Sequence, residues 1–463
     1  MREKRPLAIA VLLSLLAVNG WLVHRHGAYA QSAGHAQIGG HLFHAGKLPG
    51  ARRAFPSTWS KTRVFADCVE LRNSLQSAAQ IRFVATHFVG TQKLLVPLIR
   101  KLRAVNPNFI VLHYHLGAWQ SGKHVPYILD GLHWGNDYNY VNRHESWFLH
   151  TTYADRHNPE DRLMASDGKL LMNVTNPHYV RYLIQSLIRQ VRAGHDDGVF
   201  LDSWSTDAVN YYVGRYPQWR YPGLIRPHKQ LGGLTWVQAS ETFMRHVTAA
   251  LNKAGIYVLP NLGDLITDWD HTNYAIPNGG MLEAAPGVWS RYGQAQWIFS
   301  ANKALAIIHA DKIIMFQSYL PQETDYQARL YWLGTYLLLR GHYTYITYFA
   351  HLPMEYFPEF GINVGTPLKS ARHGINDLRQ GSLYVRPFTR GIVVVNSATH
   401  KTAHYHVPPG YSKAIVRGGG NIDLNGKADG KVLYVPARGY VRLKPESALI
   451  LVRRNRQSSS NCY

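Results

Sequence analysis

The feature that most constrains this chain is a regular alternation of short apolar runs with longer amphipathic stretches, from about residue 80 to residue 378. Runs such as 109–116 (FIVLHYHL) and 198–203 (GVFLDS) are apolar over most of their length, which is typical of parallel strands covered on both faces. Parallel strands need crossover connections, which are usually helices. The candidate strands are 81–89, 109–116, 170–175, 198–203, 256–261, 279–284, 312–319 and 343–349.

Amphipathic stretches separate most of these runs. Leu183, Leu187 and Val191 recur at helical spacing, and Asn176-Pro177 before them supplies an N-cap and a first helical residue. Eight strands with intervening helices favour a closed (β/α)8 TIM barrel of class α/β, although the same periodicity also fits an open sheet. The expected helices are 91–104, 178–193, 235–254, 290–309 and 325–340.

The first thirty residues are typical of a targeting segment. Arg2, Lys4 and Arg5 precede an apolar run over 7–23, and residues 28–30 (AYA) form a small-x-small cleavage site. The pattern predicts a signal peptide or, because the apolar run is long, an uncleaved membrane anchor. In both cases the rest of the chain is expected to be secreted or periplasmic.

The pattern changes after residue 378, where helical periodicity gives way to short β runs separated by Gly, Pro and Asn. This change predicts a small antiparallel β domain, a sandwich or partial barrel. The 463 residues accommodate a barrel of roughly 250 residues with such a domain. The predicted parts are a signal peptide or anchor (1–30), a linker and lead-in (31–79), the catalytic barrel (80–378), a β-sandwich domain (379–455) and a tail (456–463).

The chain is strongly basic, with 50 Lys and Arg against 28 Asp and Glu and a formal net charge of +22. This balance favours anionic partners such as acidic polysaccharide or anionic lipid, and it also fits a protein kept soluble in an acidic medium. Nucleic acid is disfavoured because the basic residues are dispersed and no zinc finger, RNP or basic-helix motif is present. Only two cysteines, Cys68 and Cys462, occur, which excludes a disulfide scaffold and a Cys-based zinc site.

Two expected strands end in an acid. Asp202 follows GVFL and Glu283 follows GGML, and a carboxylate at the end of a buried strand is costly unless it is paired or used. In a parallel barrel the carboxyl ends of all strands meet at one rim, where active sites are built. Loop capping by Asp202 and a salt bridge from Glu283 are the structural alternatives. Asn261 ends another strand and could bind a sugar hydroxyl, orient a carboxylate or form a turn.

Two carboxylates at one rim meet the needs of glycoside hydrolysis, in which one acid is ionised and the other is protonated. We assign Asp202 as nucleophile or base and Glu283 as acid, with the reverse assignment open. No cofactor and no metal are needed for this chemistry.

The segment 197–202 (DGVFLD), with Asn261 and Glu283 ending later strands, resembles the hypothetical glycosyl-hydrolase families with a TIM barrel that are related to endo-α-1,4-polygalactosaminidases. The resemblance covers about residues 80–375, and the β domain resembles the C-terminal sandwich of such enzymes. It implies a retaining or inverting hydrolase of a polysaccharide, without indicating which sugar.

A second segment adds to this resemblance. Residues 147–149 and 171–177 look like the third-strand region of these families, where Asn173 stands at a position that is commonly Asp. The departure argues against a catalytic role for Asn173.

Aromatic side chains near strand ends fit sugar binding, because the apolar faces of sugars stack on such rings. Core packing is the alternative for each ring. The expected substrate-binding residues are Asn261, Trp204, Tyr114, Trp119, Trp147, Gln317, Tyr319 and Tyr348.

The sequence therefore predicts an exported glycoside hydrolase that cleaves an extracellular or envelope polysaccharide containing anionic or amino sugars. One alternative is a non-catalytic carbohydrate-binding barrel protein. Another is a metal-dependent polysaccharide deacetylase or amidohydrolase that uses His113 and His115, which lie two apart on one strand.

Overall fold

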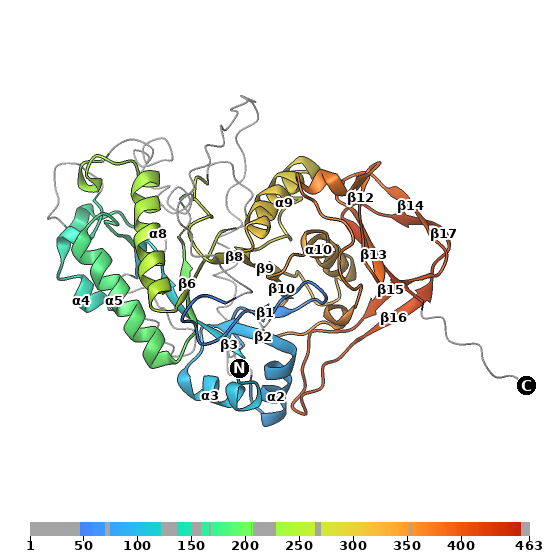
Figure 1. Cartoon of the computed structure of the whole chain (residues 1–463), viewed down its shortest axis with the longest axis horizontal. Helices are drawn as coiled ribbons and strands as arrows, with labels where there is room; N and C mark the ends of the chain where they lie inside the picture. Colours follow the sequence, from blue (N-terminus) through green and yellow to red (C-terminus); the bar gives the residue numbers. More distant parts are fainter. Residues whose placement is uncertain are drawn as a thin grey trace, which may run out of the picture. The chain divides into compact units, whose positions relative to one another are not determined.

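The computed structural model describes most of the chain after residue 46, and these residues belong to one compact unit (Figure 1). The predicted targeting segment 1–30, the tail 456–463 and Cys462 lie outside the described residues. No helix within the described part is both long and apolar enough to cross a membrane. The described residues are 47–69, 75–121, 137–150, 159–165, 168–204, 206, 228–263, 270–351 and 354–454.

Eight parallel strands form the centre of this unit, in the order β7-β6-β3-β2-β1-β10-β9-β8. The end strands β7 and β8 meet through a parallel bridge between Asn261 and Met281, so the sheet is a nearly closed barrel. The predicted α/β barrel class is thereby confirmed. The strands are β1 (Val64–Ala66), β2 (Phe88–Gln92), β3 (Ile110–Leu116), β6 (Gly198–Asp202), β7 (Tyr257–Pro260), β8 (Gly279–Glu283), β9 (Ile313–Tyr319) and β10 (Thr344–Phe349).

Alternate residues of each barrel strand point to its interior, as the period of two requires. Phe200, Leu259, Met281 and Met315 share one interior cluster of buried side chains. Gly279 lets β8 approach β9 closely, since a Cβ there would lie 1.8 Å from the carbonyl oxygen of Ile313. The residues two positions beyond these interior side chains therefore continue toward the carboxyl-terminal mouth of the barrel.

Helices cover the outside of the barrel, most of them where the sequence predicts a helix. The expected N-cap is present, because the side chain of Asn176 accepts hydrogen bonds from the backbone N–H groups of His178 and Tyr179. The helices that follow barrel strands are α2 (Ala78–His87), α3 (Val96–Val105), α5 (Pro177–Gly194), α8 (Trp236–Lys253), α9 (Gln294–His309) and α10 (Tyr326–Leu339).

The structure corrects two of the expected strands. Most of 81–89 belongs to helix α2, which begins at a capping box between Ser77 and Gln80, and the strand starts only at Phe88. Residues 170–175 contain only the short β5 (Leu170–Leu171), which pairs antiparallel with β4 (Trp119–Gln120) outside the barrel. The third barrel strand is therefore β3, and the likeness of 171–177 to a third-strand region is not reflected in the fold.

The first barrel strand is β1, which lies within the expected lead-in 31–79. It was missed because it has only three residues, too few to show a period. The barrel lacks the strand expected at 170–175 and gains β1, so the number of strands before β6 is unchanged. Asp202 and Glu283 therefore end the fourth and sixth barrel strands, as expected.

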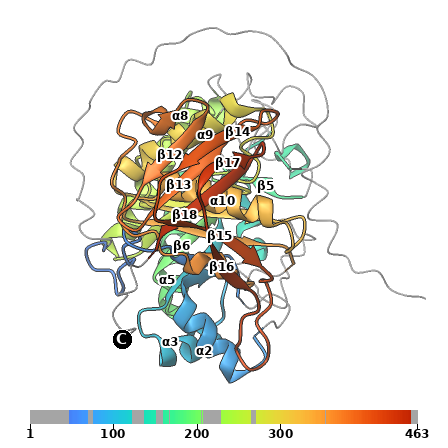
Figure 2. The ribbon, with the colours of Figure 1, turned by 90° about the vertical axis from the view of Figure 1, so that its right-hand side faces the viewer.

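The region after residue 378 is antiparallel β structure, as predicted. Six strands pair in the order β11-β12-β13-β18-β15-β16, and β14 pairs with β17 over them (Figure 2). Helix α10 packs on the other face of the larger sheet, with Leu333 and Leu337 in the same core as Val393 and Ile450. The strands are β11 (Arg379–Gln380), β12 (Leu383–Pro387), β13 (Gly391–Asn396), β14 (Ala403–Val407), β15 (Tyr411–Arg417), β16 (Lys431–Pro436), β17 (Gly439–Leu443) and β18 (Ser447–Arg453).

Candidate active site

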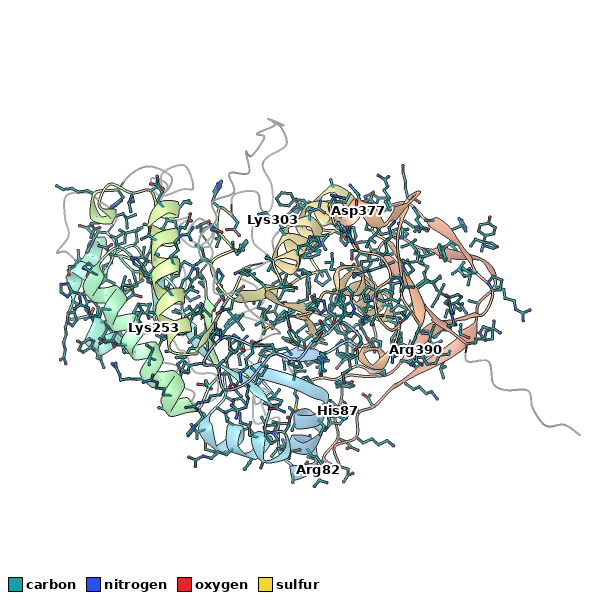
Figure 3. All side chains as sticks on the ribbon, in the orientation of Figure 1. Arg82, His87, Lys253, Lys303, Asp377 and Arg390 are labelled. Atoms are coloured by element: carbon teal, nitrogen blue, oxygen red, sulfur yellow. The ribbon has the colours of Figure 1, made fainter. Side chains whose placement is uncertain are left out.

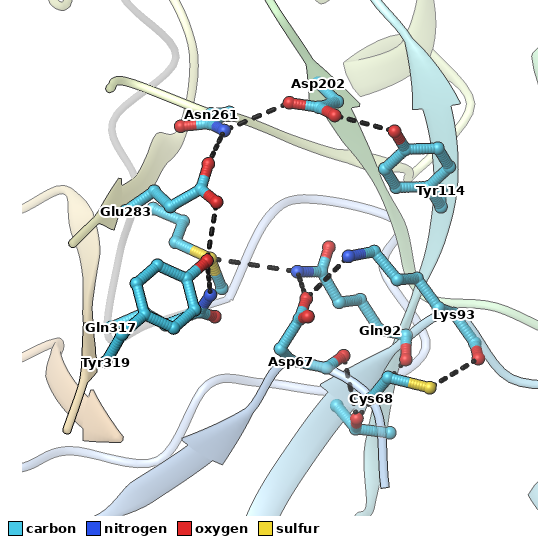
Figure 4. Close-up of polar contacts among 12 residues, drawn as sticks. Asp67, Cys68, Gln92, Lys93, Tyr114, Asp202, Asn261, Glu283, Gln317 and Tyr319 are labelled. Carbon is cyan, nitrogen blue, oxygen red and sulfur yellow. Dashed lines mark hydrogen bonds and ion pairs between the residues drawn. The ribbon is translucent and has the colours of Figure 1, made fainter. Parts of the chain in front are cut away.

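Asp202 and Glu283 lie at the same mouth of the barrel, joined by one amide group (Figure 4). Asn261 Nδ2 donates hydrogen bonds to Asp202 Oδ1 at 3.0 Å and to Glu283 Oε2 at 2.6 Å. These two oxygens are therefore no more than about 5.6 Å apart, the sum of the two lengths. The structure thus brings together the two acids and the amide that the sequence singles out.

The strand period explains why these three side chains converge. Each stands two residues after an inward-pointing residue of its strand, namely Phe200, Leu259 and Met281. Ser203 and Ala284, directly after the acids, have φ of 53° and 60°, which non-glycine residues adopt rarely. Backbone strain of this kind is concentrated at functional sites.

Asp202 is held in its ionised form. Tyr114 donates its hydroxyl to Asp202 Oδ2 at 2.6 Å, and the backbone N–H of Ser203 donates to Oδ1 at 2.8 Å. Burial alone would raise the pKa of Asp202, but the charge of Lys169, the Tyr114 hydrogen bond and the charge of Lys93 together lower it below the ordinary value. Asp202 is therefore a carboxylate over most of the pH range.

Glu283 is shifted in the opposite direction. Burial and then the negative charge of Asp202 raise the pKa of Glu283, against hydrogen bonds from Tyr319 and Asn261. Tyr319 donates its hydroxyl to Glu283 Oε1 at 2.5 Å, and Gln317 Nε2 donates to the Tyr319 oxygen at 3.0 Å. Two neighbouring carboxyl groups with opposite pKa shifts are suited to one nucleophilic and one acidic role.

A second polar group faces the same mouth and was not found from the sequence. Lys93 Nζ lies 2.8 Å from Asp67 Oδ1, which also accepts a hydrogen bond from Gln92. Asp67 follows β1, which the sequence pattern did not reveal, and residues 92 and 93 fall inside a stretch expected to be helical. The available signal in the sequence was that the polar residues Gln92 and Lys93 directly follow the short apolar run 88–91, as a functional pair at a strand end would.

Lys169 is the other charged residue that sequence analysis overlooked. Its side chain is buried, and its charge lowers the pKa of Asp202. It precedes β5 in the long connection between β3 and α5, a position that no strand pattern marks as part of the barrel mouth.

Four of the eight expected substrate-binding residues contact the acids or their partners. Tyr114, Asn261, Gln317 and Tyr319 do so through the hydrogen bonds described above. Their observed contacts orient the two carboxyl groups, and sugar binding by them stays a prediction.

The other four expected residues are buried in the hydrophobic core. Trp119, Trp147 and Trp204 belong to the cluster around α5 and α8, where Trp204 stacks on Phe243 at 5.3 Å. Tyr348 lies three residues after the inward-pointing Tyr345 of β10, so its side chain is on the outer face of the strand, in the core around α9 and α10. Their burial gives these four rings packing contacts, and sugar binding by them stays a prediction.

His113 and His115 point away from the barrel mouth, because the neighbouring Leu112 and Tyr114 occupy the inward positions of β3. His113 Nε2 lies 2.8 Å from Gln190 Oε1 on α5 and Nδ1 lies 3.3 Å from Asp196. Among the described residues, no group of three or more His, Cys, Asp or Glu side chains is arranged to hold a metal ion. The two histidines therefore make packing and hydrogen-bond contacts outside the site.

A nearly closed parallel barrel with paired carboxyl groups at its mouth has the architecture of a glycoside hydrolase. The model of hypothetical glycosyl hydrolase family 15 matches residues 103–392, more than half of the chain. The chain belongs to this family, and the protein is a glycoside hydrolase with a carbohydrate substrate. No curated protein sequence matches it.

Solved structures of other glycoside hydrolases resemble the chain distantly. The maltogenic α-amylase AmyB of Thermotoga neapolitana has a TM-score of 0.43 at 8% identity, over 85% of this chain and 99% of that one. The α-amylase of Geobacillus thermoleovorans has a TM-score of 0.39 at 12% identity, over 86% and 99%. The GH36 α-galactosidase AgaA of Geobacillus stearothermophilus has a TM-score of 0.38 at 10% identity, over 87% and 57%. Likeness at this level does not indicate a substrate.

Proposed function

We propose that this protein is a retaining glycoside hydrolase in which Asp202 is the nucleophile and Glu283 the acid/base. The observation that supports retention is the shared amide of Asn261, which limits the nearest oxygens of the two acids to about 5.6 Å. Retaining enzymes place their carboxyl groups about 5–5.5 Å apart, whereas inverting enzymes need roughly 6.5–9.5 Å to admit a water. The opposite pKa shifts of the two acids support the same assignment of roles.

In the first step, an Asp202 oxygen attacks the anomeric carbon while the glycosidic C–O bond breaks. Glu283 transfers its proton to the departing oxygen, which leaves as a hydroxyl of the shortened glycan. In the second step, the ionised Glu283 takes a proton from water, and the water oxygen displaces Asp202 from the anomeric carbon. Both carboxyl groups return to their starting states.

The stereochemistry of the first product tests this mechanism. We expect proton NMR of the early reaction mixture to show a reducing sugar with the same anomeric configuration as the cleaved bond. Mutarotation follows later and serves as an internal reference for the other anomer. An initial product of opposite configuration would contradict the nucleophilic role of Asp202.

The titration of the two acids predicts a bell-shaped pH profile, because Asp202 must be ionised and Glu283 protonated. The Tyr319 hydrogen bond lowers the pKa of Glu283, so Tyr319→Phe is expected to raise that pKa. Since activity is lost as pH rises through the pKa of Glu283, the alkaline limb should move to higher pH. This shift is measured in kcat/KM profiles.

Tyr114→Phe is the matched control, because it removes the corresponding hydrogen bond from Asp202. It should raise the pKa of Asp202 and move the acid limb upward while leaving the alkaline limb in place. Identical shifts in both variants would argue against separate titrations.

We further propose that the enzyme is exported and that its substrate is an extracellular or envelope polysaccharide with anionic or amino sugars. The targeting pattern in 1–30, which fits a cleaved signal or a membrane anchor, supports export. The net charge of +22 supports an anionic polymer. Exposed basic side chains include Arg82 on α2, Lys253 on α8 and Arg390 in the turn between β12 and β13 (Figure 3).

Salt dependence tests the charge of the substrate. On an anionic polysaccharide, kcat/KM should fall several-fold as ionic strength rises from 0.1 to 1 M, because the Debye length falls from about 10 Å to about 3 Å. Cleavage of a neutral oligosaccharide under the same conditions is the control. Equal salt dependence for the two substrates would contradict a role for the basic surface.

A further inference from the structure

We propose that Asp67, Gln92 and Lys93 form a hydroxyl-binding group that holds two adjacent free hydroxyls of the sugar attacked by Asp202. The inference rests on the proposed function, since it deepens the description of the same site. It assigns a substrate class, a sugar residue with an unsubstituted vicinal diol, to residues that do not themselves take part in breaking the glycosidic bond.

The position of the group places it across the barrel mouth from the amide bridge. Asp67 and Lys93 follow the neighbouring strands β1 and β2, and Figure 4 shows their side chains directed toward the space that Asp202 and Glu283 also face. Gln92 Nε2 lies 3.7 Å from the Sδ atom of Met281. Met281 is on β8, two residues before Glu283. The group therefore lies at the same mouth of the barrel as the acids.

The chemistry of the group matches a diol. A sugar hydroxyl both donates and accepts a hydrogen bond, so a carboxylate beside an ammonium can serve two neighbouring hydroxyls. Charge-assisted hydrogen bonds of this kind are stronger than neutral ones. The side chains of Asp67 and Lys93 are 16% and 14% exposed, which keeps both within reach of a ligand while most of each is buried.

An unsatisfied amide oxygen is a second, independent observation. Gln92 is fully buried and its Oε1 has no hydrogen-bond partner among the described residues, although its Nε2 donates to Asp67 and lies near Met281. A buried acceptor without a donor is destabilising. A ligand hydroxyl held between Asp67 and Gln92 would supply the missing donor.

The backbone at Lys93 argues against a purely structural ion pair. Lys93 has φ of 62°, a left-handed conformation that favours glycine, and this conformation turns the chain where β2 ends. Its ammonium lies over the Tyr114 ring at 5.0 Å and adds to the lowering of the Asp202 pKa. A strained residue that also brings a partly buried cation toward the nucleophile is more typical of a ligand site than of packing.

The test combines side-chain and substrate changes. Asp67→Asn and Lys93→Met are compared with wild type on the p-nitrophenyl hexoside that wild type cleaves fastest and on its monodeoxy analogues. Each variant should lose roughly 10- to 100-fold in kcat/KM on the parent glycoside, the effect of one charged hydrogen bond. On the analogue that lacks the contacted hydroxyl, the same variant should lose little more kcat/KM, because the interaction is already absent. All values are taken on the plateau of each variant's pH profile, so that the higher pKa of Asp202 expected in Lys93→Met does not contribute to the comparison.

Lys253→Met, which changes an exposed lysine on α8, is the matched control and should behave as wild type on every analogue. If the kcat/KM loss caused by each substitution multiplied with the loss caused by removing a hydroxyl, whichever hydroxyl is removed, the inference would be overturned and the proposed function would stay intact. Monodeoxy analogues that wild type cleaves as well as the parent would overturn it too, even if both variants fail to fold. Failure of wild type to cleave any glycan would instead contradict the proposed function.

Discussion

Asp202→Asn is expected to lower kcat/KM on a natural glycan by about 10⁴-fold or more, because the amide cannot form the covalent intermediate. The side chain keeps its size, and its amide oxygen in place of Oδ1 still accepts from the backbone N–H of Ser203. Its NH2 group in place of Oδ2 can donate to the hydroxyl oxygen of Tyr114. Thermal unfolding should therefore change little. Reducing-end release from a purified polysaccharide measures the loss, and turnover like that of wild type would remove Asp202 from the mechanism.

Glu283→Gln separates the acid role from the nucleophilic role. On a natural glycan, kcat/KM of this variant should fall by about 10²- to 10⁴-fold, which is the usual contribution of a general acid. A 2,4-dinitrophenyl glycoside has a leaving group that needs no proton, so glycosylation should be largely restored on it and deglycosylation should then limit turnover. Asp202→Asn should stay inactive on both substrates. Equal losses on both substrates for Glu283→Gln would contradict its role as the acid.

Glu359→Gln is expected to destabilise the fold by about 3–5 kcal/mol, because it leaves a buried guanidinium without its counter-charge. Arg329 on α10 and Glu359 in the 3-10 helix η6 (Pro358–Gly361) are both fully buried. They form a two-pronged pair, with Arg329 Nε 2.7 Å and Nη2 2.6 Å from the two carboxylate oxygens. Arg329 also donates to the carbonyl of Gly418 at 2.9 Å, which ties α10 to the C-terminal β structure.

The matched control for this prediction is Glu241→Gln, which removes an exposed ion pair between Glu241 and Arg245 on α8. Exposed pairs of this spacing contribute about 0.3–0.5 kcal/mol. Chemical denaturation followed by circular dichroism compares the two variants. Similar midpoints for both would show that burial does not set the strength of the Arg329–Glu359 pair.

The barrel was predictable because most of its strands are recognisable as continuous apolar runs in the sequence. Runs such as 312–319 and 343–349 are apolar on both faces, and the structure places strands within one residue of these bounds. The segment 81–89 does not form the expected strand over most of its length, because an apolar run of that length fits a helix as well as a strand. The capping pair Ser77 and Gln80 was the local signal that favoured the helix.

The residues of the site were likewise predictable only where they end a strand with a recognisable pattern. Asp202, Asn261 and Glu283 could be found because each ends a recognisable strand, and strand ends share one rim. Asp67 follows a strand of three residues, and Lys169 lies in an irregular connection, so neither has a periodic pattern around it. The aromatic residues could not be sorted, because Tyr114 and Trp204 differ in burial partners rather than in sequence context.

The sequence by itself determined the α/β barrel, the antiparallel β region and the two acids, because each follows from the period of side chains along a strand or helix. Only the tertiary structure decided which partners surround those acids. The direction of each pKa shift depends on Lys169 and on groups on or just after β2, β3, β7 and β9, which are distant in the chain and meet only at the mouth of the closed sheet. Electrostatic interactions act through space, and a linear pattern contains no distances between strands.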